Sequence, residues 1–228
     1  MPNYTYLLGS LLLISFWLIL FLFRKDLRRE MLVISTVVLF SGMILQYFFW
    51  TKDWWHPETM TGTILGPEDF LGLFGIGGIS SVIYGTIFSK GLSFYKHQPN
   101  ISIRNIALLA FIFIALHSIA YYIFGLSSWM SWTIATTITT LFIYSLRSDL
   151  IFNSLVSGVL MVLIGIAGYQ LLNFFQPGFI YSWFKLENLS GFIIIGVPIE
   201  DVAWFMTFGM FIGPIYEFLT EARSKPIN

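Results

Sequence analysis

Seven long apolar stretches set the strongest limit on how this chain can fold. Each has about 20 residues, the length that a helix needs to cross roughly 30 Å of hydrocarbon. They lie near residues 5–23, 31–50, 67–89, 104–124, 127–146, 151–175 and 197–220. Hydrophobic residues fill 57% of the 228 positions, which is more than the core of one water-soluble domain could bury. The sequence therefore predicts an all-α, polytopic membrane protein with seven transmembrane helices.

The positive charges favour one orientation in the membrane. Ten of the 12 lysines and arginines lie in the loops after the first, third and fifth stretches or in the C-terminal tail. Basic loops tend to stay in the cytoplasm, so we expect the N-terminus outside the cell membrane and the C-terminus inside. Arg24-Lys25 follows the first stretch and no basic region precedes it, which favours a retained helix over a signal peptide.

Composition and spacing exclude several classes of function. A formal net charge of zero argues against a nucleic-acid partner, and the absence of cysteine removes disulfides, iron–sulfur clusters and thiol catalysis. His56, His97 and His117 are too scattered to form a metal site, so we expect no metal. The glycines from Gly72 to Gly78 follow no strand, which indicates close helix packing rather than a dinucleotide site. We therefore expect no cofactor.

Two further membrane-protein classes are disfavoured by missing residues. The last stretch, 197–220, has no lysine that could form a Schiff base with retinal. No stretch carries the aspartate-rich clusters that bind magnesium pyrophosphate in polyprenyl transferases. The sequence thus excludes a retinal protein and argues against prenyl transfer.

Two acidic pairs, Glu68-Asp69 and Glu200-Asp201, each open an apolar stretch after a loop rich in aromatic residues. An ionisable residue at the edge of hydrocarbon costs several kcal/mol unless it is used or partnered, so it indicates a functional site. The alternative is that each pair caps its helix, where negative charge at the N-terminus gains about 0.3–1 kcal/mol. Two occurrences in similar surroundings favour function.

The surroundings of the acidic pairs belong to an internal repeat. The first stretch ends in Arg24-Lys25-Asp26 and the fifth ends in Arg147-Ser148-Asp149. We therefore expect two parallel three-helix repeats, helices 1–3 and 5–7, with helix 4 between them. The corresponding boundaries are 1–96 for the first repeat, 97–126 for the linking helix and 127–228 for the second repeat, all within one integral membrane domain. Parallel repeats commonly share a site at their interface.

Four polar residues lie on the same side of the membrane as the acidic pairs. They are Gln46, Tyr169, Gln170 and Asn173, at the outer ends of the second and sixth stretches. Such side chains either hydrogen-bond a carboxylate or join neighbouring helices, and joining is the commoner role.

The second acidic pair stands in the sequence Pro198-Ile199-Glu200-Asp201, followed by Val202-Ala203-Trp204-Phe205. Together with its repeat, this pattern resembles the flavin-independent lycopene cyclase domain family over nearly the whole chain. In that family the two repeats occur as two small subunits or fused, as they are here. The first copy departs from the pattern because Gly66 fills the proline position and Pro67 the variable one.

The resemblance implies a redox-neutral isomerase that closes the acyclic ends of lycopene into β-type ionone rings during carotenoid biosynthesis. One acid protonates the terminal double bond, the next double bond attacks the tertiary cation, and a base removes a proton. A carboxylic acid serves as donor near neutral pH only where desolvation or a neighbouring negative charge keeps it protonated. The implied catalytic residues are Glu200, Asp201, Glu68 and Asp69, with Glu200 ranked first.

Aromatic faces can stabilise the cation without quenching it. The candidate substrate-binding residues are Trp54, Trp55, Phe70, Tyr181, Trp183, Trp204 and Phe205. The simpler interpretation is that tryptophan and tyrosine gather at membrane interfaces whatever the function. We expect two or three of them to line a cavity.

The expected partners are the lipid bilayer and a long apolar polyene, lycopene, with self-association or association with other carotenoid enzymes left open. Two rival hypotheses also stay open, a non-enzymatic carotenoid- or lipid-binding membrane protein and a small proton-coupled transporter. The sequence leaves undecided whether one or both substrate ends are cyclised, the ring type, and whether the first acidic pair is active.

Overall fold

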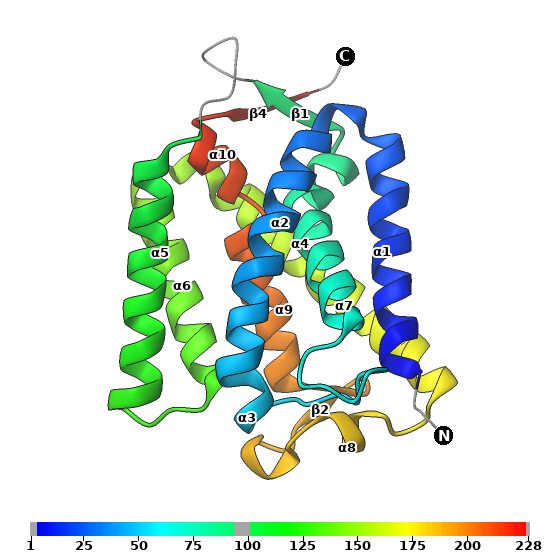
Figure 1. The fold of residues 1–228 in the computed structure, drawn as a ribbon. Coiled ribbons are helices and arrows are strands. Elements are labelled where there is room, and N and C mark those ends of the chain that lie inside the picture. Colours follow the sequence, from blue (N-terminus) through cyan, green and yellow to red (C-terminus); the bar gives the residue numbers. More distant parts are fainter. Residues whose placement is uncertain (1–3, 94–100, 227–228) are drawn as a thin grey trace.

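Long helices form almost the whole protein. The computed structural model describes residues 4–93 and 101–226, and Figure 1 shows their arrangement as a helical bundle. The helices are α1 (Thr5–Phe23), α2 (Arg28–Leu45), α3 (Thr51–Asp53), α4 (Pro67–Ile87), α5 (Ile103–Ser118), α6 (Ser128–Leu146), α7 (Ile151–Phe175), α8 (Ile180–Trp183), α9 (Ile199–Ile212) and α10 (Ile215–Thr220). The strands are β1 (Lys90–Ser93), β2 (Ile193–Ile194), β3 (Val197–Pro198) and β4 (Arg223–Pro226).

Six helical segments are long and apolar enough to cross a membrane, so the chain is an integral membrane protein. They are Thr5–Phe23, Lys25–Asp53, Pro67–Ile87, Ile103–Ile123, Ser148–Phe175 and Ile199–Thr220. The second and fourth continue past α2 and α5 through the π-helical turns Gln46–Trp50 and Ile119–Ile123.

Helix α6 is also long, but it is not one of the six segments apolar enough to cross a membrane. Its many serine and threonine residues lower the hydropathy, although hydroxyls such as those of Thr136 and Thr139 donate to backbone carbonyls of the preceding turn. This bonding satisfies a hydroxyl without water. The count of seven membrane spans therefore stays a prediction.

Helices α4 and α9 form the centre of the bundle. Helices α1 and α2 pack against α4, while α6 and α7 pack against α9. Glycines permit the close approach in both halves. A Cβ atom on Gly42 would lie 2.6 Å from Leu73 Cδ2, and one on Gly165 would lie 2.4 Å from Phe205 Cε2. When Arg24 is aligned with Arg147 and Glu68 with Glu200, these two contacts correspond, so the chain consists of two repeat-like halves.

One end of the bundle is tied together by two arginines, and we call it the arginine end. Arg24 binds both carboxylate oxygens of Asp26 and donates to the carbonyls of Gly85 (2.6 Å) and Lys90 (2.5 Å). Strands β1 and β4 pair antiparallel at the same end. The side chain of Arg24 thereby joins the end of α1 to the end of α4.

Arg147 repeats this arrangement in the second half. It binds both carboxylate oxygens of Asp149 and donates to the carbonyls of Glu217 (3.5 Å) and Ala222 (2.9 Å). The Arg-x-Asp pattern that marks the repeat in the sequence thus has the same structural role in both halves.

The proposed domain boundary between residues 96 and 97 lies outside the described residues. The two halves also contact each other directly, because α4 packs against both α7 and α9. Figure 1 shows α4 and α9 side by side within one bundle.

Replacing Arg24 with Gln should destabilise the protein more than replacing Arg147. Hydrogen bonds to a charged group contribute about 1.5–3 kcal/mol each, and the carbonyl contacts of Arg24 are the shorter ones. We expect Arg24→Gln to lower the free energy of unfolding in detergent by about 2–4 kcal/mol. The exposed Lys52→Gln is the control and should change little. Equal losses for both arginine variants would contradict this ranking.

Candidate active site

Both acidic pairs lie at the first turn of a central helix, as the sequence predicts. Pro67 begins α4 and Pro198 directly precedes α9, and proline at a helix start removes a backbone N–H that would have no partner. All four carboxylates are buried, with at most 5% of each residue exposed. We call this end of the bundle the carboxylate end, and it lies opposite the arginine end (Figure 1).

The two glutamates have matching contacts. Glu68 accepts a hydrogen bond from the backbone N–H of Met60 (2.5 Å), and Glu200 accepts one from Ser190 (2.6 Å). In the described part of the chain, the Oε2 atom of each has no hydrogen-bond partner. Each glutamate therefore holds the loop in front of its helix against the helix start.

Asp69 has three hydrogen-bond donors among the described residues. It accepts hydrogen bonds from the Tyr6 hydroxyl, the Gln46 side-chain amide and the backbone N–H of Gly66, the last at 2.7 Å. The bond from Gly66 is a helix cap, so capping accounts for part of the role of Asp69. The other two bonds connect α1 and the end of α2 to α4.

Asp201 is bound from both halves of the protein. Its Oδ1 accepts a hydrogen bond from Trp54 Nε1 (3.1 Å) in the first half, and its Oδ2 accepts one from the Tyr169 hydroxyl in α7. Tyr169 corresponds to Gln46 when the halves are aligned on their arginines. Both halves therefore use the same position of the same helix to bind the aspartate.

A cavity of about 280 Å³ lies beside Asp201. Helices α1, α4, α7 and α9 form its walls, which are mostly aromatic and aliphatic, and the polar groups of Tyr6, Gln46, Tyr169 and Asp201 converge on it. An apolar pocket with a few convergent polar groups is typical of a ligand site. Of the four carboxylates, all of which the structure describes, Asp201 is the one that lines this cavity.

The two aromatic loops, residues 54–66 and 184–198, are joined to each other at the carboxylate end, and we call the joined loops the roof because Trp54, Trp55 and the adjacent Trp183 line the cavity there. Trp55 and Phe184 form an isolated β-bridge, with backbone bonds from His56 to Trp183 (2.6 Å) and from Lys185 to Trp54 (2.9 Å). Strands β2 and β3 fold the second loop into a short hairpin. Trp54, Trp55 and Trp183 project from this region into the cavity lining.

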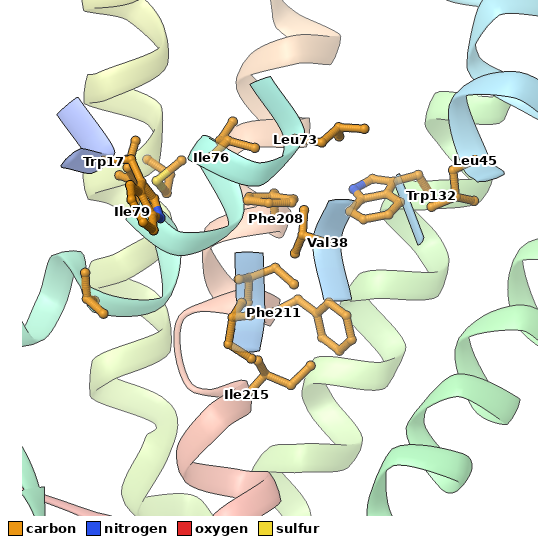
Figure 2. Close-up of a cluster of buried hydrophobic side chains, with 14 of the residues drawn as sticks. Trp17, Val38, Leu45, Leu73, Ile76, Ile79, Trp132, Phe208, Phe211 and Ile215 are labelled. Carbon is orange, nitrogen blue, oxygen red and sulfur yellow. The ribbon is translucent and has the colours of Figure 1, made fainter. Parts of the chain in front are cut away.

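A packed apolar layer separates the cavity from the arginine end. Figure 2 shows Ile79, Phe208, Phe211 and Ile215 packed in this layer, beyond the cavity-lining Leu73 and Ile76. Past the layer, Glu30 and Glu217 are buried at the arginine end, where Asn153 donates to Glu217 Oε1 (2.7 Å). The described side chains thus place buried carboxylates at both ends with apolar packing between them.

The two halves differ at positions that border the cavity, because tryptophans stand where the first half has two of the cavity-lining glycines. Gly9 and Gly72 line the cavity, and the aligned halves place Trp132 and Trp204 at their equivalents. The two indole rings lie 6.1 Å apart, and each also packs edge-on against Trp50. The side chains of the two repeats therefore differ around this tryptophan cluster.

The structure brings five of the seven aromatic candidates to the cavity, namely Trp54, Trp55, Trp183, Trp204 and Phe205. Phe70 and Tyr181 instead lie on the surface, 48% and 67% exposed. Sequence reasoning missed Tyr6 and Trp50, which also line the cavity. Their positions near the ends of apolar stretches resemble those of ordinary interfacial aromatic residues.

The remaining polar candidates have structural contacts. Gln170 donates to the carbonyl of Ile195 (2.5 Å), and Asn173 accepts from the backbone of Gly178 (2.9 Å). His117 is buried against Phe49 and Phe113. His97 lies outside the described residues. Within residues 4–93 and 101–226, no group of three or more acidic, histidine or cysteine side chains could hold a metal.

The two aspartates should differ in their effect on stability. Asp69→Ala removes a helix cap and leaves the Tyr6 and Gln46 donors without their acceptor, and each buried donor left unpaired costs about 1–3 kcal/mol. We expect its free energy of unfolding in detergent to fall by about 3–5 kcal/mol, and that of Asp201→Ala to fall by at least about 1 kcal/mol less. A larger loss for Asp201→Ala would show that Asp201 is mainly structural.

Comparison with known proteins gives one family. Residues 3–87 and 127–219 match the family described as lycopene cyclase. The two matched ranges correspond to the two repeat-like halves and together include both acidic pairs. No curated protein and no solved structure matches the chain.

Proposed function

Because the chain belongs to the lycopene cyclase family and is a carotenoid cyclase by that membership, we propose that it converts the acyclic ends of lycopene into β-ionone rings, with Asp201 as the acid. The observation that carries this proposal is the position of Asp201 at the wall of a largely aromatic and aliphatic cavity. The reaction is an isomerisation and needs no oxidant or reductant.

The proposed reaction begins when Asp201, in its protonated form, transfers a proton to the terminal double bond of the polyene. The electrons of that double bond form the new C–H bond and leave a tertiary cation. The next double bond along the chain attacks this cation, which closes the six-membered ring and moves the positive charge into it. Loss of a ring proton restores a double bond, and its return to Asp201 regenerates the acid.

The surroundings of Asp201 suit both the donation and the later acceptance of a proton. A carboxylic acid in apolar surroundings resists ionisation, whereas donors to the carboxylate stabilise the ionised form. Asp201 has both, because it is 5% exposed and is bound by Trp54 and Tyr169. A carboxyl group subject to both influences can give up a proton and then take one back.

The aromatic lining supports the cationic intermediates. A desolvated aromatic face contributes roughly 0.5–2 kcal/mol to binding a cation. Trp54 and Trp204 have ring centroids 6.1 Å apart, and Phe205 lies 5.2 Å from Trp204. These rings surround the space next to Asp201 and exclude the water that would trap a cation as an alcohol.

The other three carboxylates have positioning roles in this proposal. Glu68 and Glu200 hold the two roof loops, and Asp69 fixes Tyr6 and Gln46 at the cavity wall. Glu200 therefore acts through the roof that covers the substrate. This assignment differs from the order favoured by the sequence, which ranks Glu200 first.

We also propose that the halves are parallel three-helix repeats, helices α1, α2 and α4 against α6, α7 and α9. The carboxylate end then faces the outside of the cell and the arginine end faces the cytoplasm, as the distribution of basic residues indicates. A proton-coupled transporter fits less well, because the apolar layer of Figure 2 interrupts the path between the buried carboxylates.

Asp201→Asn should abolish cyclisation while the protein still folds. A side-chain amide cannot donate the required proton, and loss of general acid catalysis typically costs 10²- to 10⁴-fold in rate. The measurement is pigment analysis of lycopene-producing cells, with Glu187→Gln on the exposed part of a roof loop as the matched control. Cyclic carotenoids from Asp201→Asn at the control level would refute the role of Asp201. Membrane-inserted wild type that leaves lycopene unchanged would favour a carotenoid-binding protein.

A reaction confined to the cavity beside Asp201 also predicts the order of products. The substrate must leave and reverse before its second end can react, so monocyclic carotenoid should appear before bicyclic carotenoid. A time course of purified protein with lycopene in lipid vesicles measures this order. Bicyclic product that forms from the start without a monocyclic precursor would require a second working site.

A further inference from the structure

The cavity is covered at two of its sides. The joined loops form the roof, with Trp55 bridged to Phe184. The apolar layer that contains Phe208 and Ile79 forms the floor. A long polyene therefore needs another route to Asp201.

The cavity reaches the outer surface of the bundle between α1 and α7. Two of its lining residues, Leu12 in α1 and Leu171 in α7, are 37% and 41% exposed. Both helices are apolar enough to span the membrane, so this surface faces lipid. Helix α1 packs mainly on α4 and helix α7 mainly on α9, which leaves the seam between them lightly packed.

Glycine keeps the seam open. A Cβ atom added to Gly168 of α7 would meet no heavy atom of the described residues within 4 Å, although Gly168 lines the cavity. A Cβ atom on Gly165, one turn away, would collide with Phe205 at 2.4 Å. Gly168 therefore borders empty space, whereas Gly165 borders packed side chains. The position equivalent to Gly168 in the first half is Leu45, which is buried in the core.

We propose that the seam between α1 and α7 at Gly168 is a lateral portal, through which one end of a linear polyene enters from the bilayer. This inference rests on the proposed function. The cavity of about 280 Å³ is near the lower limit of the range, roughly 300–1,000 Å³, for sites that enclose a drug-sized ligand. It accommodates one end of the chain, and the rest of the polyene stays in lipid against α1 and α7.

Entry from the bilayer is favoured because it keeps the polyene out of water. A polyene that moves from lipid into an apolar cavity never exposes its surface to water, so no hydrophobic free energy is lost during entry. The roof can then stay closed through the reaction and keep water away from the cation. Release of the ring back into lipid uses the same seam.

The absence of cysteine from the chain permits a direct test. Gly168→Cys introduces a single thiol into open space, and Leu163→Cys introduces one on the lipid-facing side of the same helix, where Leu163 is 58% exposed and does not line the cavity. Each variant is reconstituted in lipid vesicles and treated with a membrane-permeant maleimide, with and without lycopene. Extent of labelling and rate of cyclisation are measured on the same samples.

We expect lycopene to slow the labelling of Gly168→Cys at least several-fold and to leave that of Leu163→Cys unchanged. Labelled Gly168→Cys should lose its cyclisation activity, and labelled Leu163→Cys should keep it. Labelled Gly168→Cys that cyclises lycopene at the unlabelled rate would overturn the portal. Equal protection of both thiols by lycopene would also overturn it, because the effect would then come from lycopene in the bilayer.

The same experiment separates the portal from the proposed reaction. Protection of Gly168→Cys without cyclisation by any variant, wild type included, would support the portal and reject the cyclase assignment. Cyclisation that persists after complete labelling of Gly168→Cys would support the enzyme and reject the portal. If unlabelled Gly168→Cys is inactive beside an active wild type, protection of its thiol by lycopene decides the portal on its own.

Discussion

The burial of four carboxylates next to hydrocarbon is the constraint on which the rest of this structure depends. An ionised group without partners is costly in such a place, so each carboxylate needs donors. The glutamates find their donors in the loop just ahead of each helix, whereas the aspartates also bind donors from distant parts of the chain. Met60 and Ser190 bind the two glutamates, Tyr6 reaches Asp69, and Trp54 reaches Asp201 from the other half. Meeting the needs of the carboxylates therefore fixes both loops, the start of α1 and the interface between the halves.

The two repeats share corresponding helix and polar contacts, but they differ in the side chains near the cavity. The arginine contacts, the glutamate contacts and the glycine contacts at Gly42 and Gly165 correspond in both halves. The residues at the cavity wall do not correspond, because tryptophans occupy the positions equivalent to Gly9 and Gly72. A tryptophan that fills an unused cavity gains packing and apolar burial. The tryptophans at these positions therefore contribute to the stability of the bundle.

Much of this architecture could be read from the sequence because it depends on local patterns. Apolar length predicts the long helices, proline or glycine ahead of an acidic pair predicts the helix starts, and the Arg-x-Asp motif marks the same position in both repeats. The difference between Asp69 and Asp201 was not accessible in this way. It depends on which residues from other helices face each carboxylate. The sequence around Tyr6 or Trp132 contains no pattern that indicates such contacts. The buried Glu30 and Glu217 were missed for the same reason, since each stands near a loop where a charged residue is ordinary.

The need to exclude water relates the shape of the cavity to the proposed cyclisation. A tertiary carbocation reacts rapidly with water, so an enzyme that makes one must cover the site before the proton moves. A site that opened to the aqueous phase would have to close over each substrate end. Here the roof loops are bridged to each other and the floor is packed, while the lightly packed seam faces lipid. Lipid cannot quench the cation, so an opening on that side can stay open during catalysis, and the substrate itself can fill it. In the proposed reaction, the membrane thus completes the wall of the cavity, and a bundle this small protects a reactive cation without a moving lid.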